Sequence, residues 1–116
     1  MKRLNCAIGS LLLTAMAATS SLAQRTGNAQ KGRENYMVFG CYQCHGRVAQ
    51  GARGPVVAQV KYPFEAFEVF VRQPTGGGMP VYTRQMLSDQ DLLDIYSYLQ
   101  TLPGPRSPAE LPALLR

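Results

Sequence analysis

The sequence predicts a small all-α domain in which three main helices are joined by Gly/Pro-rich loops. Apolar residues recur at helical spacing in three stretches, near residues 29–39, 63–72 and 88–102. No stretch alternates apolar and polar residues for long enough to indicate a strand. Gly and Pro are frequent in the segments between the helices, where they favour turns.

A separate unit precedes this domain at residues 1–23. Lys2 and Arg3 form a charged start, an apolar run from Ile8 to Ala18 follows, and Ser21-Leu22-Ala23 matches a signal peptidase site. The sequence therefore predicts export to the periplasm and a mature chain that starts at Gln24. An uncleaved anchor is the alternative, but the apolar run is about a dozen residues long against the ~20 that span a bilayer. No stable membrane span is expected once the signal is removed.

The first helix of the domain is expected near residues 29–39. Gly32 and Tyr36 lie four positions apart and so share one face. Because Gly32 has no side chain, another helix can approach closely over the Tyr36 ring.

Directly after this helix comes Cys41-Tyr42-Gln43-Cys44-His45, which has the C-x-x-C-H spacing of covalent c-type haem attachment. On one helical turn Cys41 and Cys44 lie on the same face, so both sulfurs can reach the vinyl groups of one porphyrin. His45 then supplies the proximal axial ligand of the iron. The motif predicts one haem c, attached through Cys41 and Cys44 and bound at the metal by His45.

The C-x-x-C spacing also occurs in zinc sites and in thioredoxin-like redox sites. A zinc site needs a fourth ligand, yet His45 is the single histidine and Cys6, the one further cysteine, lies in the predicted signal. A thioredoxin-like site needs a preceding strand, whereas the surroundings of the motif favour helix. Haem attachment is therefore the preferred interpretation.

The loop after the motif offers a partner for the second ring nitrogen of His45. In metal sites this nitrogen commonly donates to a backbone carbonyl, which fixes the tautomer and the ring plane. Gly54-Pro55 follows closely, and Pro55 presents a carbonyl but has no N–H of its own. A simple Gly-Pro turn explains the same residues equally well, so both interpretations stay open.

A second helix is expected near residues 63–72. It begins with proline, which is favoured in a first turn. Phe64, Phe67 and Val71 form one stripe along it, and such residues are more often core than binding surface.

A six-coordinate iron would need a distal ligand other than histidine, because no second histidine exists. Met37 lies too close before the haem motif to reach the other face, and Met86 sits at the entry to the last helix, where packing explains it. Met79 follows Gly76-Gly77-Gly78 and precedes Pro80. The glycines allow the backbone to pass close to a flat cofactor, and the proline restricts the backbone conformation directly after Met79. Met79 is therefore the predicted sixth ligand.

The last helix has the clearest start, because Ser88 as N-cap with Asp91 three residues on is close to a capping box. Asp94 and Ser97 are expected to face solvent. Pro103-Gly104 ends the helix. The domain is accordingly placed at residues 24–103, and a Pro-rich, largely extended tail at 104–116 is expected to be disordered or to lie on a partner. The apolar side of the helix comprises Leu92, Ile95, Tyr96, Leu99 and Leu102.

Composition limits the kinds of partner. Removal of the signal leaves 93 residues, which is few for a self-sufficient apolar core, and a buried porphyrin would supply the missing apolar surface. The net charge falls from +5 to +3 with the loss of Lys2 and Arg3. No nucleic-acid partner is expected, since no stripe of Arg/Lys with interleaved aromatic residues occurs. A basic rim that docks an acidic redox partner stays open.

Taken in their order, these pieces resemble the class I, monohaem cytochromes c over about residues 28–103. The resemblance implies an all-α cytochrome c fold wrapped around one haem, in which the first and last helices cross where Gly32 and Tyr36 meet Tyr98 or Tyr96. It also implies His45/Met79 ligation, with the Pro55 carbonyl accepting from His45. The spacer from Gly32 to Cys41 is nine positions, one longer than expected in the family. The matching segments are the Gly32/Tyr36 helix, Cys41-Tyr42-Gln43-Cys44-His45-Gly46, Gly54-Pro55, Gly78-Met79-Pro80-Val81-Tyr82 and the helix that follows Leu87-Ser88-Asp89.

The implied function is one-electron carriage between ferric and ferrous haem, in exchange with redox partners such as a periplasmic dehydrogenase or oxidase. No enzyme activity is expected, because residues 76–82, the predicted distal loop, contain no Asp, Glu, His, Lys or Arg that could donate or accept a proton. Two alternatives stay open: a dedicated cytochrome subunit of a periplasmic dehydrogenase or oxidoreductase complex, and a haem enzyme or gas sensor with an open distal site. Candidate partners of the haem propionates are Arg53, Lys61, Tyr62 and Arg72.

Overall fold

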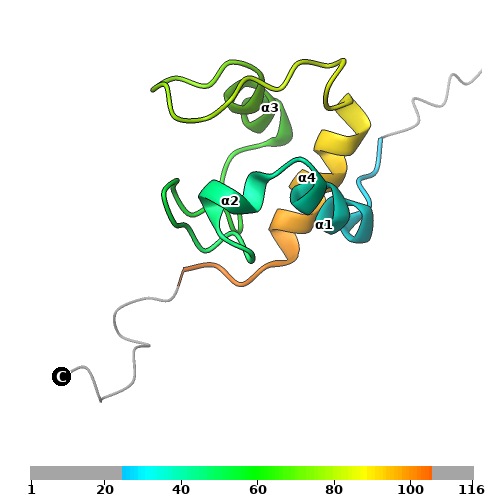
Figure 1. Ribbon diagram of the computed structural model, residues 1–116. Coiled ribbons are helices and arrows are strands. Elements are labelled where there is room, and N and C mark those ends of the chain that lie inside the picture. The colour runs from blue at the N-terminus through cyan, green and yellow to red at the C-terminus, as the bar shows by residue number, and fades with distance from the viewer. Residues whose placement is uncertain (1–24, 106–116) are drawn as a thin grey trace, which may run out of the picture.

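The computed structural model describes residues 25–105, and Figure 1 shows their arrangement. The described range contains four helices and no strand, so the all-α prediction is confirmed. The predicted signal at residues 1–23 and the tail from residue 106 onward lie outside the described residues. The helices are α1 (Ala29–Val38), α2 (Cys41–His45), α3 (Phe64–Arg72) and α4 (Asp89–Thr101).

Helices α1 and α4 cross in close contact (Figure 1). Gly32 lies at the crossing, where a Cβ would overlap the backbone carbonyl group of Asp94. Beside it, the ring of Tyr36 lies 5.7 Å from the ring of Tyr98, measured between centroids. The Tyr36 hydroxyl donates to the carbonyl oxygen of Gly46 at 2.7 Å, which ties the crossing to the end of α2. Of the two tyrosines expected at the crossing, Tyr98 is therefore the one that meets Tyr36.

Tyr96 belongs instead to the contact between α3 and α4. Its ring centroid lies 5.6 Å from that of Phe64 and 5.3 Å from that of Phe67. Its hydroxyl donates to the carbonyl oxygen of Tyr62 at 2.8 Å. The apolar stripe predicted for α3 thus packs against α4, and the buried core of the described residues comprises Tyr36, Ala49, Ala58, Phe67, Val71, Leu87, Leu92, Ile95, Tyr98 and Leu99.

Helix α4 begins as its sequence predicts. The Ser88 side chain caps it by accepting from the backbone N–H of Asp91 at 3.1 Å. Helix α1 has a matching cap that the sequence analysis did not name, because the Asn28 side chain accepts from the N–H of Lys31 at 3.0 Å.

Asp94 is buried, and the expectation that it faces solvent is wrong. Only 2% of this residue is exposed. Its Oδ1 accepts from the backbone N–H of Asn28 at 2.8 Å and from Nε2 of Gln90 at 2.9 Å. The close crossing over Gly32 brings the start of α1 onto this side of α4, so the carboxylate satisfies an N–H group at that helix end. Ser97 is half-buried and donates to the carbonyl oxygen of Leu93.

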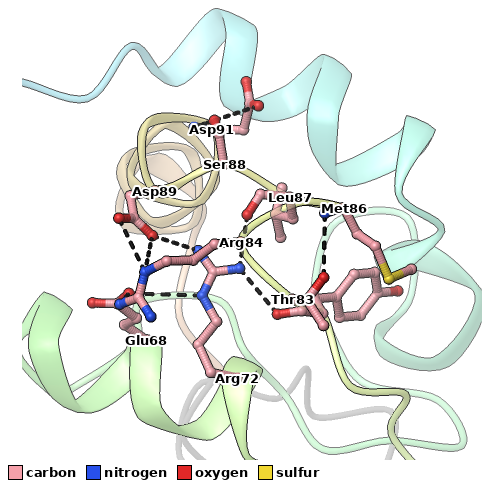
Figure 2. Close-up of polar contacts among 10 residues, drawn as sticks. Glu68, Arg72, Thr83, Arg84, Met86, Leu87, Ser88, Asp89 and Asp91 are labelled. Carbon is pink, nitrogen blue, oxygen red and sulfur yellow. Dashed lines mark hydrogen bonds and ion pairs between the residues drawn. The ribbon is translucent and has the colours of Figure 1, made fainter.

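An ion-pair cluster joins the end of α3 to the start of α4 (Figure 2). Nη2 of Arg72 lies 2.8 Å from Oδ1 of Asp89. Arg84, from the loop between the two helices, bridges Glu68 at 2.6 Å and Asp89 at 3.0 Å. The two arginines differ in environment, since the Arg72 side chain is 9% exposed and that of Arg84 is 62% exposed.

The free energy of unfolding should decrease at acid pH because of Asp89. Partial desolvation raises the pKa of this carboxyl group, but the hydrogen bonds and charges of Arg84 and Arg72 outweigh it and hold the pKa below its ordinary value of 3.8. Because the folded-state pKa is the lower one, the stabilisation is fully present above pH 3.8 and is lost as pH falls through the folded-state pKa.

Denaturant unfolding of the wild type and of Asp89→Asn across pH measures this effect. The difference in free energy of unfolding between the two proteins should stay constant near neutrality and shrink below about pH 4. A difference that stays unchanged throughout the acid range would contradict the role assigned to the Asp89 carboxylate.

Candidate haem site

A cavity of about 850 Å³ lies between α2, the loop that follows it, α3 and the loop that joins α3 to α4. This volume is within the range of about 300–1,000 Å³ that is usual for cofactor sites. Its wall includes apolar side chains such as Val57, Phe67 and Leu99. All five residues that the sequence predicts for the site line this one cavity: Cys41, Cys44, His45, Pro55 and Met79.

Helix α2 consists of the C-x-x-C-H motif alone. Gly40 adopts a left-handed conformation, with φ of 77°, and so separates α2 from α1. Cys41 and Cys44 are both half-buried free cysteines on the cavity wall. The short helix therefore presents both sulfurs to the same space, as the spacing of the motif requires.

The environment of Cys41 differs from that of a reactive thiol. Burial raises the pKa of the Cys41 thiol to about 11. Redox-active C-x-x-C cysteines need the opposite shift, because the thiolate is the nucleophile. The buried thiol therefore weighs against the thioredoxin-like alternative.

His45 contacts the carbonyl that the sequence analysis considered for it. Its Nδ1 lies 2.9 Å from the carbonyl oxygen of Pro55. A carbonyl oxygen accepts, so Nδ1 is the protonated nitrogen in this contact and Nε2 is left with its lone pair. The Gly54 N–H donates to the carbonyl oxygen of Cys44 at 2.7 Å. A Cβ on Gly54 would lie only 3.0 Å from Cε1 of His45, so the glycine lets this loop approach the ring.

Of the three methionines in the described range, Met79 is the one on the cavity wall. Met79 also lines a smaller cavity of about 240 Å³, together with Cys41 and His45. Met86 is 60% exposed and lies outside both cavities. Met37 is half-buried and packs against the core.

Two of the three glycines before Met79 adopt backbone conformations that favour glycine. Gly76 and Gly77 have φ angles of 111° and 73°, a region that side chains disfavour. A Cβ at Gly76, Gly77 or Gly78 would meet no protein atom within 4 Å. Gly76 and Gly78 line the cavity, so this part of the loop borders that space.

Three of the four candidate propionate partners lie on the cavity wall, namely Arg53, Lys61 and Tyr62. Arg72 does not. Its guanidinium group bonds two backbone carbonyls through Nη1 and Asp89 through Nη2, so both terminal nitrogens have partners outside the cavity. A basic residue close to the site in sequence need not face it, and only the tertiary structure separates the two cases.

Tyr82 is a site residue to which the sequence analysis assigned no role. It lines both cavities, and its hydroxyl donates to the carbonyl oxygen of Phe39 at 2.8 Å. Burial raises the pKa of Tyr82, and the nearby Cys41 and Cys44 add to the shift. Its place three residues after Met79 is the signal that could have marked it.

These features are those of a monohaem c-type cytochrome domain, and comparison with known families bears this out. Residues 27–99 match the family described as cytochrome C oxidase, cbb3-type, subunit III, and the chain belongs to this family. The family's domain carries covalent haem c and transfers electrons, so the predicted cytochrome c class and cofactor are confirmed. No curated protein and no solved structure matches the chain.

Within residues 25–105, no helix is long and apolar enough to cross a bilayer.

Proposed function

We propose that the chain is a periplasmic one-electron carrier whose haem is ligated by His45 and Met79. The observation that carries this proposal is the single cavity that brings the C-x-x-C-H helix together with Met79. The contents of the cavity wall fit a porphyrin, because two free cysteines, one imidazole and one thioether share an otherwise largely apolar space.

Bound haem supplies one-electron exchange between ferric and ferrous iron. Cys41 and Cys44 hold the macrocycle by thioether bonds. The contact with the Pro55 carbonyl orients His45 and leaves Nε2 for the metal. Met79 contributes a thioether, which favours the ferrous state compared with a second imidazole. The apolar wall acts in the same direction, because low dielectric disfavours the extra positive charge of the oxidised centre.

A potentiometric titration of the purified holoprotein tests the carrier function. We expect a single transition with the slope of one electron, and no carbon monoxide complex of the reduced protein at neutral pH, because Met79 occupies the sixth position. Formation of a carbon monoxide complex at neutral pH would instead favour the open-site alternative, a haem enzyme or gas sensor.

The family description favours a second role, as the cytochrome subunit of a larger oxidoreductase complex. In this role the Pro-rich residues 104–116 dock onto the catalytic chain. Affinity purification of the full chain at native expression level should then recover a larger enzyme, and a variant that ends at Pro103 should recover less of it. A free carrier would elute alone at its own mass in both cases.

Export predicts a defined mature chain. The intact mass of the exported holoprotein should equal that of residues 24–116 plus one haem, since signal peptidase is expected to cut after Ala23. Mass spectrometry of the protein from a host with a haem-attachment system measures this directly. A mass that includes residues 1–23 would show a retained anchor, and a mass without haem would refute covalent attachment.

A further inference from the structure

The loop that carries Met79, here called the Met79 loop (residues 73–88), is held unevenly. On the side before Met79, Gly76, Gly77 and Gly78 have no protein atom close enough to contact a Cβ. On the side after Met79, the loop is anchored at several points: Arg72 bonds two of its backbone carbonyls, and the Tyr82 N–H donates to the carbonyl oxygen of Val71 at 3.4 Å.

Arg72 bonds this second half of the loop directly (Figure 2). Its Nη1 donates to the carbonyl oxygen of Tyr82 at 3.0 Å and to that of Leu87 at 2.7 Å. One guanidinium group thus joins two backbone positions that lie five residues apart in the loop. Tyr82 is also held on its other side, through its hydroxyl bond to Phe39.

The guanidinium group is itself fixed in place. Its Nη2 donates to Oδ1 of Asp89 at 2.8 Å, at the first position of α4. Its Nε is buried without a hydrogen-bond partner and lies 3.6 Å from Oε1 of Glu68, at ion-pair rather than hydrogen-bond distance. An arginine suits this place because its planar fork offers two terminal nitrogens, one for the two carbonyls and one for the carboxylate, whereas a lysine has a single nitrogen.

We infer that Arg72 is a positioning residue for Met79: it locks the Met79 loop onto α3 and α4, so that the thioether stays within reach of the iron. The inference rests on the proposed Met79 ligation. Without the lock, the loop would open to a state in which the sixth position is accessible while α1 and α4 remain packed. Hydrogen bonds to a charged group are strong enough for their loss to change such an equilibrium by about 10- to 100-fold.

Imidazole binding to the ferric holoprotein measures the opening, because imidazole can occupy the sixth position only when Met79 has left it. Arg72→Gln should raise the apparent affinity for imidazole by about 10- to 100-fold, as the open state becomes more populated. In a urea titration of Arg72→Gln, the weak red sulfur-to-iron band should disappear at a lower urea concentration than the helical circular dichroism signal. The difference between these two urea concentrations should be larger than in the wild type.

Arg84→Gln is the matched control: Arg84 lies in the loop and contacts the same two carboxylates, but its side chain is exposed and bonds no loop carbonyl, so these surface ion pairs should hold the loop much less. We expect its imidazole affinity to stay within about threefold of the wild type. Arg72→Lys keeps the charge but not the fork, so it should restore only part of the lock. If Arg72→Gln yields no folded holoprotein, Asp89→Asn provides the test, because it removes one fixed partner of Arg72 and should raise imidazole affinity by a smaller factor.

These experiments distinguish failure of the role inferred for Arg72 from failure of the proposed Met79 ligation. A red band in the wild type combined with equal imidazole affinities for Arg72→Gln and Arg84→Gln would overturn the role of Arg72 and leave Met79 as ligand. Loss of the band and of helical signal at one urea concentration in every variant would do the same. A wild type without the red band would overturn Met79 ligation and, with it, this role of Arg72.

Discussion

Substitution of Met79 by alanine should lower the reduction potential of the holoprotein by a few tenths of a volt, within the span of about 0.8 V that axial ligands set. In the proposed ligation, the Met79 thioether stabilises ferrous iron, and its removal would leave the sixth position to water or to an added ligand. Met79→Ala should also lose the red sulfur-to-iron band and bind carbon monoxide when reduced.

Met86→Ala is the control for this substitution. Met86 is exposed and lies outside both cavities, so its removal should leave the potential and the spectrum unchanged. If Met79→Ala keeps the wild-type band and potential, Met79 is not the ligand.

Replacement of Gly32 by alanine should cost the protein about 3 kcal/mol or more of its free energy of unfolding. The added methyl group would overlap the carbonyl group of Asp94 and crowd the backbone nitrogen of Ile95. Both obstacles are backbone atoms of α4, so relief requires α1 and α4 to separate and disturbs the contact between Tyr36 and Tyr98. Denaturant unfolding of the holoprotein measures the loss.

Glu34→Ala provides the comparison for Gly32→Ala. Glu34 lies on the exposed side of the same helix, α1, so its replacement by alanine should change the free energy of unfolding by no more than about 0.5 kcal/mol. An equal effect at the two positions would show that the close crossing at Gly32 is not what requires glycine there.

The features that the sequence predicts well depend on residues close together in the chain. The C-x-x-C-H spacing defines the cofactor, and the Ser88 cap defines the start of α4, because each is complete within a single turn. Gly32 and Tyr36 also mark their face of α1 by local spacing. The partner of Tyr36 on α4, Tyr98 rather than Tyr96, depends on how the two helices rotate against each other, which no local pattern specifies.

The features that the sequence does not predict depend on distant neighbours. The sequence indicates a solvent-exposed Asp94, but in the structure its carboxylate accepts from an N–H at the start of α1, 66 positions away. The charge of Arg72 makes it a candidate propionate partner, but in the structure it bonds the carbonyl oxygens of Tyr82 and Leu87. Tyr82 reaches Phe39 over 43 positions. Polarity and charge indicate that such side chains need partners but not which partners they find.

The absorption spectrum of the holoprotein tests the central claim, covalent haem c with His45 and Met79 as ligands, most directly. The reduced, denatured sample in pyridine should give a c-type spectrum, and the native ferric protein at neutral pH should show the weak red band of sulfur-to-iron charge transfer. A c-type pyridine spectrum without that red band would contradict Met79 ligation, and the open-site alternative would then take the place of the electron carrier.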